Sequence, residues 1–126
     1  MVATGGRTKM KARLLGFGCV EIDGTEYTHD VLIDRGQVRK RNKALSKPFR
    51  GSLGHTPLSM AEDIPWGGHQ LIIGTGVDGA LPILPDVHDE AARRGINLIT
   101  LPTGKACELV DSLDQRDVRA ILHITC

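Results

Sequence analysis

The stretch Leu71-Ile72-Ile73-Gly74-Thr75-Gly76 constrains the fold more than any other part of the chain. An apolar triplet that runs into a glycine-flanked threonine is typical of a buried parallel strand that ends in a tight loop. In open α/β sheets, ligands bind in the crevice beyond the carboxyl ends of the strands. The stretch therefore predicts a central strand, and it also predicts the edge of the sheet at which a ligand site would lie.

After this stretch, extended and helical patterns alternate. The predicted order is strand 71–73, helix 86–94, strand 96–101, helix from 103 and strand 118–124. Thr103 is predicted to be the N-cap of the second helix, whose apolar face at i, i+3, i+4 and i+7 is Ala106, Leu109, Val110 and Leu113. This alternation predicts a sheet with right-handed crossover connections.

The first third of the chain predicts a β meander instead. Extended patterns over 14–22, 25–33 and 37–39 are separated by turn signals at Asp23-Gly24 and at Asp34-Arg35-Gly36.

The middle of the chain predicts less regular structure. Residues 41–54 show no sustained period and are interpreted as a long basic loop or an irregular edge strand. Residues 56–62 predict a short helix, begun either by a Thr56 cap or by a capping box between Ser59 and Glu62. Residues 1–10 are interpreted as a flexible tail, and 11–126 as a single domain.

Composition excludes several classes of function. Aromatic residues make up only 3% of the 126 residues, which argues against a stacking platform for nucleic acid. The net charge is +1, so the overall charge does not steer the protein to polyanions. Residues 35–50 hold seven basic and no acidic residues; they are interpreted as a solvated face, because nucleic-acid binding would require them to form one stripe. The three cysteines form no disulfide framework, and no apolar run approaches the roughly 20 residues of a membrane span. We expect a cytoplasmic protein without a membrane segment.

The Gly74-Thr75-Gly76 loop matches the Gly-x-Gly-x-x-Gly pattern as far as Gly79. A dinucleotide site would also need a helix that opens directly from the loop and an acid at the end of the next strand. Pro82 and Pro85 prevent that helix, and the next strand ends without an acid. No nucleotide cofactor is therefore expected; the alternatives are a tight packing turn or a backbone nest for a small anion.

Two further residues could join such an anion site. Thr103 begins a helix at the same edge of the predicted sheet, and His123 lies near the end of the last strand. The candidate ligand-binding residues are Gly74, Thr75, Gly76, Thr103 and His123.

No catalytic residue and no metal ligand is assigned. His123 and Cys126 lie three residues apart, so in a strand their side chains would point to opposite faces. The other histidines singled out, His55, His69 and His88, share no metal-binding spacing and are interpreted as surface or loop residues.

Together these motifs resemble the Mth-938-like domain family. The resemblance is carried by 71–76 with Gly79 and Leu81, by Leu101-Pro102-Thr103 with Ala106, by 122–126, and by parts of 46–62. It implies a three-layer α/β fold with a mixed central sheet flanked by helices and an added N-terminal β meander. It also implies assembly or regulatory roles, without an established enzymatic activity.

Two functions therefore remain open. The first is a non-enzymatic accessory, assembly or regulatory protein that binds a protein partner. The second is a protein, which could be an enzyme, that binds a small anionic metabolite at the strand ends. The sequence does not determine the oligomeric state.

Overall fold

The computed structural model describes residues 8–126, so most of the predicted tail lies outside the described residues. The strands are β1 (Ala12–Gly16), β2 (Cys19–Ile22), β3 (Thr25–Tyr27), β4 (Val31–Asp34), β5 (Gln37–Lys40), β6 (Gln70–Thr75), β7 (Asn97–Leu101) and β8 (Arg119–His123). The helices are α1 (Pro85–Arg93) and α2 (Thr103–Ser112), with 3-10 helices η1 (Lys43–Phe49) and η2 (Gln115–Asp117). In the described part of the chain, none of the helices is long and apolar enough to cross a membrane.

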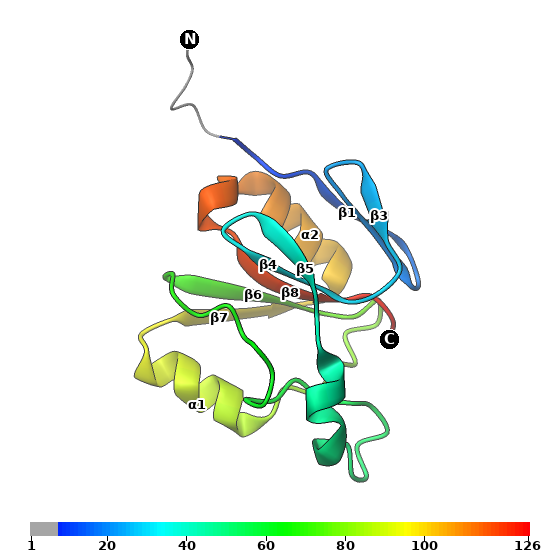
Figure 1. Ribbon diagram of the computed structural model, residues 1–126, viewed down its shortest axis with the longest axis vertical. Helices are drawn as coiled ribbons and strands as arrows, with labels where there is room; N and C mark the ends of the chain where they lie inside the picture. Colours follow the sequence, from blue (N-terminus) through cyan, green and yellow to red (C-terminus); the bar gives the residue numbers. More distant parts are fainter. Residues whose placement is uncertain (1–7) are drawn as a thin grey trace.

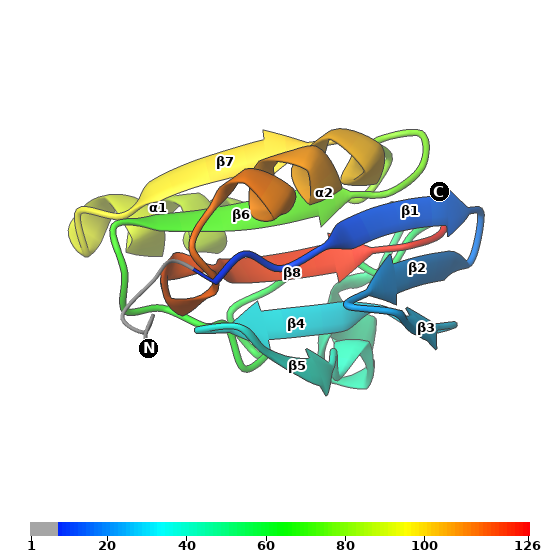
Figure 2. The same ribbon diagram turned by 90° about the horizontal axis from the view of Figure 1, so that it is seen from above.

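The central sheet is mixed, as predicted. Its strand order is β5-β4-β8-β6-β7, in which β6 runs parallel to β7 and β8, and β4 runs antiparallel to β5 and β8. The arrowheads of β6, β7 and β8 point to the same end of the sheet (Figure 2). Their carboxyl ends therefore form one common edge.

Helices cover the two faces of this sheet. A separate antiparallel sheet, β1-β2-β3, lies with α2 on one face, and α1 lies on the other (Figure 1). From β6 the chain passes through α1 to β7 on one side, and then through α2 to β8 on the other side of β6. The carboxyl ends of β6 and β8 thus form the topological switch point, where α/β sheets commonly bind ligands.

Strand β6 divides its apolar side chains between the two faces. Ile72 packs into the cluster that includes α2 and the β1-β2-β3 sheet, whereas Leu71 and Ile73 pack into the cluster that includes α1. All three are fully buried. This confirms the sequence-based interpretation of the triplet as a strand that is covered on both faces.

Residues just before position 11 also pack against the rest of the structure. Met10 is only 1% exposed and belongs to the core cluster on the α2 side. Lys9 forms an isolated antiparallel bridge with Asp114.

The N-terminal strands follow the predicted meander with two corrections. The hairpin turns at Asp23-Gly24 and Arg35-Gly36 are present, and all four of these residues have positive φ. The predicted strand 14–22 is wrong, however, because β1 and β2 form a hairpin that turns at Phe17-Gly18. The predicted strand 25–33 is also divided, since β3 pairs in the small sheet and β4 in the central one.

The predicted helix over 56–62 is not formed. Leu58 instead makes a parallel bridge with Ile83, and the following residues form a turn in which Glu62 N–H donates to Ser59 O at 3.2 Å. The capping-box residues have tertiary partners: Ser59 bonds Ser46, and Glu62 bonds Arg41. Ser59 Oγ keeps one local bond, accepting from Ala61 N–H at 3.2 Å, but the Glu62 side chain is taken up by the longer-range contacts and no capping box forms.

Candidate functional site

The Gly74-Thr75-Gly76 loop lies at the carboxyl end of β6, and its polar groups are occupied by neighbouring segments. Thr75 is buried, and its hydroxyl donates to Leu101 O at 3.0 Å. Gly76 N–H donates to Thr103 Oγ1 at 2.8 Å, and Gly76 O accepts from Thr103 N–H at 2.9 Å. The loop therefore joins β6 to the start of α2.

Both glycines are required by close packing. A Cβ on Gly76, whose φ is +109°, would lie 2.3 Å from the carbonyl carbon of Cys126. A Cβ on Gly74 would lie 2.8 Å from Thr103 Oγ1. The glycines thus allow two segments to approach the strand end.

Thr103 does not cap α2 with its side chain, which corrects the predicted N-cap. Pro102 occupies the N-cap position, and no side-chain capping bond forms there. The Thr103 hydroxyl instead donates to His123 O at 2.5 Å while accepting from Gly76. It therefore links the ends of β6 and β8.

Only part of the predicted set converges. Thr75 and His123 are paired in the parallel register of β6 and β8, on the α1 face of the sheet. Gly74 and Thr103 contact each other on the α2 face, beside Leu122. The sheet itself separates Thr103 from the His123 ring.

Two cavities lie beyond the end of β8, and His123 lines the smaller of them. The larger has a volume of about 370 Å³ and the smaller about 180 Å³, and Lys43 and Thr125 line both. We call the two cavities together the basic crevice; its positively charged and imidazole lining groups include Lys40, Lys43, Lys47, Arg50, His55 and His123. Lys43 and Lys47 belong to η1 and Arg50 follows it directly; η1 lies near the end of β8 (Figure 1).

A buried carboxylate orients the His123 ring. His123 Nδ1 lies 2.7 Å from Asp30 Oδ2, and the other Asp30 oxygen accepts from Ile124 N–H at 2.9 Å. On its opposite side, His123 Nε2 lies 3.2 Å from Thr125 Oγ1. The imidazole is thus held between a carboxylate and a hydroxyl that lines the crevice.

Asp30 also belongs to a buried ion network. Arg41 Nη1 donates to Asp30 Oδ2 at 2.8 Å, and Arg41 binds Glu62 in bidentate fashion at 2.7 and 2.9 Å. Burial alone would raise the pKa of Asp30, but the His123 hydrogen bond and charge, the Ile124 N–H and the Arg41 charge together hold that pKa below its ordinary value. Asp30 is therefore ionised at neutral pH.

Sequence reasoning missed this network. Arg41 lies within the basic run that was interpreted as a solvated face, yet it is only 3% exposed. Its partners Asp30 and Glu62 are 11 and 21 residues away, so no local spacing indicates the pairing. The one available signal was the Ser59-x-x-Glu62 pattern, which predicted a helix cap instead.

Cys126 pairs with a different histidine from the one considered in the sequence. Its Sγ lies 3.7 Å from Nδ1 of His55, which lines the smaller cavity. Across residues 8–126, no group of three or more His, Cys, Asp or Glu side chains is placed to hold a metal ion.

The family relationship follows from comparison with known proteins. A family model described as "Protein of unknown function (DUF498/DUF598)" matches residues 13–123. The chain belongs to this family. A search of curated proteins finds no match.

Solved structures of related proteins share the fold. A conserved hypothetical protein, PH1505 from Pyrococcus horikoshii OT3, is 31% identical with a TM-score of 0.72, over 93% of this chain and 100% of that one. A structure named MT938 is 25% identical with a TM-score of 0.68, over 94% of this chain and 100% of its own. A Mth938-like domain from Bordetella pertussis, solved by NMR in solution, is 18% identical with a TM-score of 0.55, over 98% of this chain and 89% of that one. These matches confirm the Mth-938-like fold of this DUF498 chain.

Proposed function

We propose that this DUF498-family protein binds a small organic anion in the basic crevice. The observation that carries the proposal is the gathering of lysine, arginine and histidine side chains around cavities at the end of β8. Asp30 also lines the larger cavity, but its carboxylate is engaged by an ion pair with Arg41 and a hydrogen bond with His123. An incoming anion would therefore meet a predominantly positive surface.

The lining supports an organic ligand with a charged group. Ala44 and Ile124 contribute to the larger cavity, whose volume lies in the range of small-molecule sites. Arg50, His55 and Thr56 line the smaller one and offer donors to a carboxylate or phosphate. We infer that the anionic group occupies the smaller cavity and the rest of the ligand the larger.

Calorimetric titration with a panel of phosphorylated and carboxylated metabolites tests this proposal. Binding should weaken with added salt, and Arg50→Gln should weaken it by about tenfold, the loss of one charge-assisted hydrogen bond. Lys105→Gln is the matched control, because Lys105 is an exposed cation on α2 that pairs only loosely with Glu108, at 3.7 Å. Equal binding by the Arg50 and Lys105 variants would contradict the assignment of the site.

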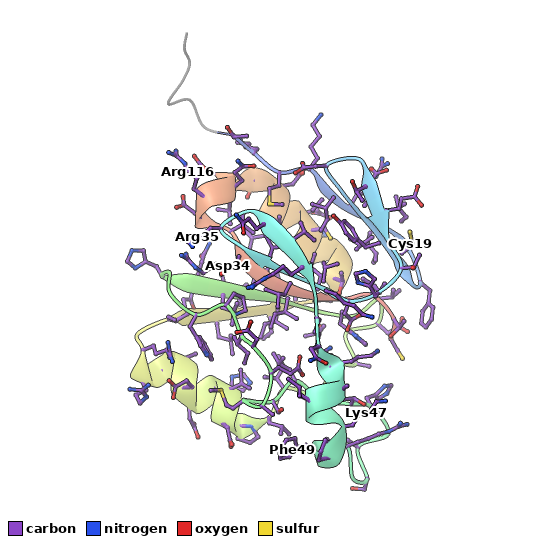
Figure 3. All side chains as sticks on the ribbon, viewed as in Figure 1. Cys19, Asp34, Arg35, Lys47, Phe49 and Arg116 are labelled. Carbon is purple, nitrogen blue, oxygen red and sulfur yellow. The ribbon has the colours of Figure 1, made fainter. Side chains whose placement is uncertain are left out.

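A second candidate function is that of an accessory or assembly protein. The observation that favours it is a group of exposed apolar side chains in and just after η1. Leu45, Phe49 and Leu53 are 46%, 48% and 44% exposed. Phe49 and Lys47 extend from different sides of η1, so an apolar contact need not cover the crevice (Figure 3). Contiguous exposed apolar surface is typical of protein contacts.

Affinity purification with paired variants tests this second function. A specific partner should be identified with the unmodified protein and lost with Phe49→Ser. The partner should be retained with Phe17→Ser, which removes an even more exposed phenylalanine (67%) from the β1-β2 turn. Equal loss with both variants, or with neither, would contradict a binding surface at η1.

A further inference from the structure

Three side chains at the edge of the basic crevice form a continuous hydrogen-bonded chain. Thr125 Oγ1 lies 3.2 Å from His123 Nε2, and His123 Nδ1 lies 2.7 Å from Asp30 Oδ2. A hydroxyl within reach of a base that a third group orients is the signature of an activated nucleophile. We propose that Thr125 is the nucleophile of an acyl-transfer site that hydrolyses small anionic esters or thioesters. This inference rests on the proposed anion-binding function of the crevice.

The direction of the hydrogen bonds suits this role. Ionised Asp30 can only accept, so the proton between Asp30 and His123 belongs to Nδ1. In neutral His123 the lone pair is then on Nε2, which faces the Thr125 hydroxyl. The hydroxyl donates to that lone pair, and His123 can take its proton as Thr125 attacks.

Buried charges lie behind the His123 ring. Asp30 and Glu62 carry two negative charges and Arg41 carries one positive charge, and these three groups are all buried. The network therefore has a net charge of −1 when His123 is neutral. When His123 Nε2 takes the Thr125 proton, the Asp30 carboxylate faces the other ring nitrogen at 2.7 Å.

Thr125 is also accessible to a ligand. It lines both cavities together with Lys43, whereas Ser46 and Ser59, the other hydroxyls of the network, are buried against Glu62 and each other. The Thr125 main chain is anchored, since its carbonyl accepts from Val77 N–H at 2.7 Å. Lys43 lines the same two cavities, and its ammonium group would supply positive charge for the oxyanion that develops on an attacked carbonyl.

The reaction balances with water as the only co-reactant. Thr125 Oγ1 forms a bond to the carbonyl carbon, and its proton passes to His123 Nε2. The bond from that carbon to the leaving oxygen or sulfur then breaks, and the leaving group takes the proton. His123 next deprotonates a water molecule that attacks the acyl-threonine, which releases the carboxylic acid and restores the Thr125 hydroxyl.

The test uses the purified protein with para-nitrophenyl hemisuccinate, which carries a carboxylate, and with para-nitrophenyl acetate, which does not. Release of para-nitrophenolate should be faster with the hemisuccinate. Thr125→Val, which is similar in shape, should reduce the rate by about a hundredfold or more, whereas Thr125→Ser should retain activity. Peptide mapping of the quenched reaction should place the acyl group on Thr125.

Two results would overturn the inference: an unchanged rate in a folded Thr125→Val variant, or acylation confined to lysines. Calorimetry on the same variants separates this failure from failure of the proposed function. If Thr125→Val still binds the anion and hydrolysis does not depend on Thr125, the role of Thr125 as nucleophile is rejected and the proposed binding site is retained. Absence of anion binding in the unmodified protein rejects the binding site and the inference that rests on it.

Discussion

His123 Nδ1 lies 2.7 Å from Asp30 Oδ2, although the two residues are 93 positions apart in the chain. Asp30 immediately precedes β4 and His123 ends β8, and these two strands are antiparallel neighbours. The strand pairing therefore places the carboxylate beside the imidazole. The same carboxylate accepts Ile124 N–H, so one buried acid determines both the ring orientation and the path of the chain beyond β8.

Glu62→Gln should lower the free energy of unfolding by about 3 kcal/mol, because it leaves the buried Arg41 charge without its bidentate partner. Urea denaturation measures the change. Asp63→Asn is the matched control, since the Asp63 carboxylate is next to Glu62 in the chain but exposed. This substitution should change the free energy of unfolding by no more than about 0.5 kcal/mol. Similar losses in the two variants would show that the Arg41 network is not the source of the stability.

Acid should destabilise the protein through Asp30. Its pKa in the folded state lies below the ordinary value of 3.8, so ionised Asp30 favours folding. This stabilisation is complete above the ordinary value and is lost as the pH falls through the folded-state pKa. Urea denaturation from about pH 5 downward should show the stability difference between the unmodified protein and Asp30→Asn shrinking. A difference that is independent of pH would contradict the depressed pKa.

Gly76→Ala should destabilise the protein by about 3 kcal/mol or more, because the new methyl group would contact Cys126 and a positive φ disfavours alanine. Thermal unfolding monitored by circular dichroism measures the effect. Gly16→Ala provides the comparison, since no heavy atom lies within 4 Å of its added Cβ and its φ is not positive. A Gly76 variant as stable as the Gly16 variant would refute the close approach.

Thr103→Val should cost about 2 kcal/mol of unfolding free energy, because Gly76 N–H and His123 O both lose a buried hydrogen-bond partner. Thr103→Ser keeps the hydroxyl and should recover most of the loss. Chemical denaturation of both variants beside Thr100→Val, at an exposed position of β7, separates the hydroxyl from a general effect of valine. The prediction fails if serine is no better than valine.

Cys107 should resist alkylation in the folded protein. Burial, together with the nearby charges of Asp111 and Glu108, raises the pKa of its thiol to about 12, so almost no thiolate is present at neutral pH. Mass spectrometry after iodoacetamide treatment should find Cys107 modified in denatured protein only. Modification at equal rates with and without denaturant would contradict the burial.

Local sequence patterns predicted the elements whose stabilising partners are nearby or repeat regularly. The apolar triplet before Gly74 predicted β6, the alternating segments after it predicted the order of α1, β7, α2 and β8, and Asp23-Gly24 predicted a hairpin turn. Periodicity carries this information because burial selects apolar side chains at the repeat of a helix or a strand. Short elements with polar partners were predicted poorly, as the unformed helix over 56–62 shows.

The sequence by itself determined the mixed α/β architecture, the glycine-flanked end of β6 and the position of His123 at the end of β8. Only the tertiary structure decided that Arg41 is buried, that Asp30 orients His123 and that Lys43 and Thr125 line the basic crevice. The physical reason is range: periodic burial is recorded in short stretches of sequence, whereas ion pairs between Arg41, Asp30 and Glu62 depend on how distant segments pack. The order of the main elements could therefore be predicted from local pattern and the mixed sheet from the family resemblance, but the partners of the buried charges could not.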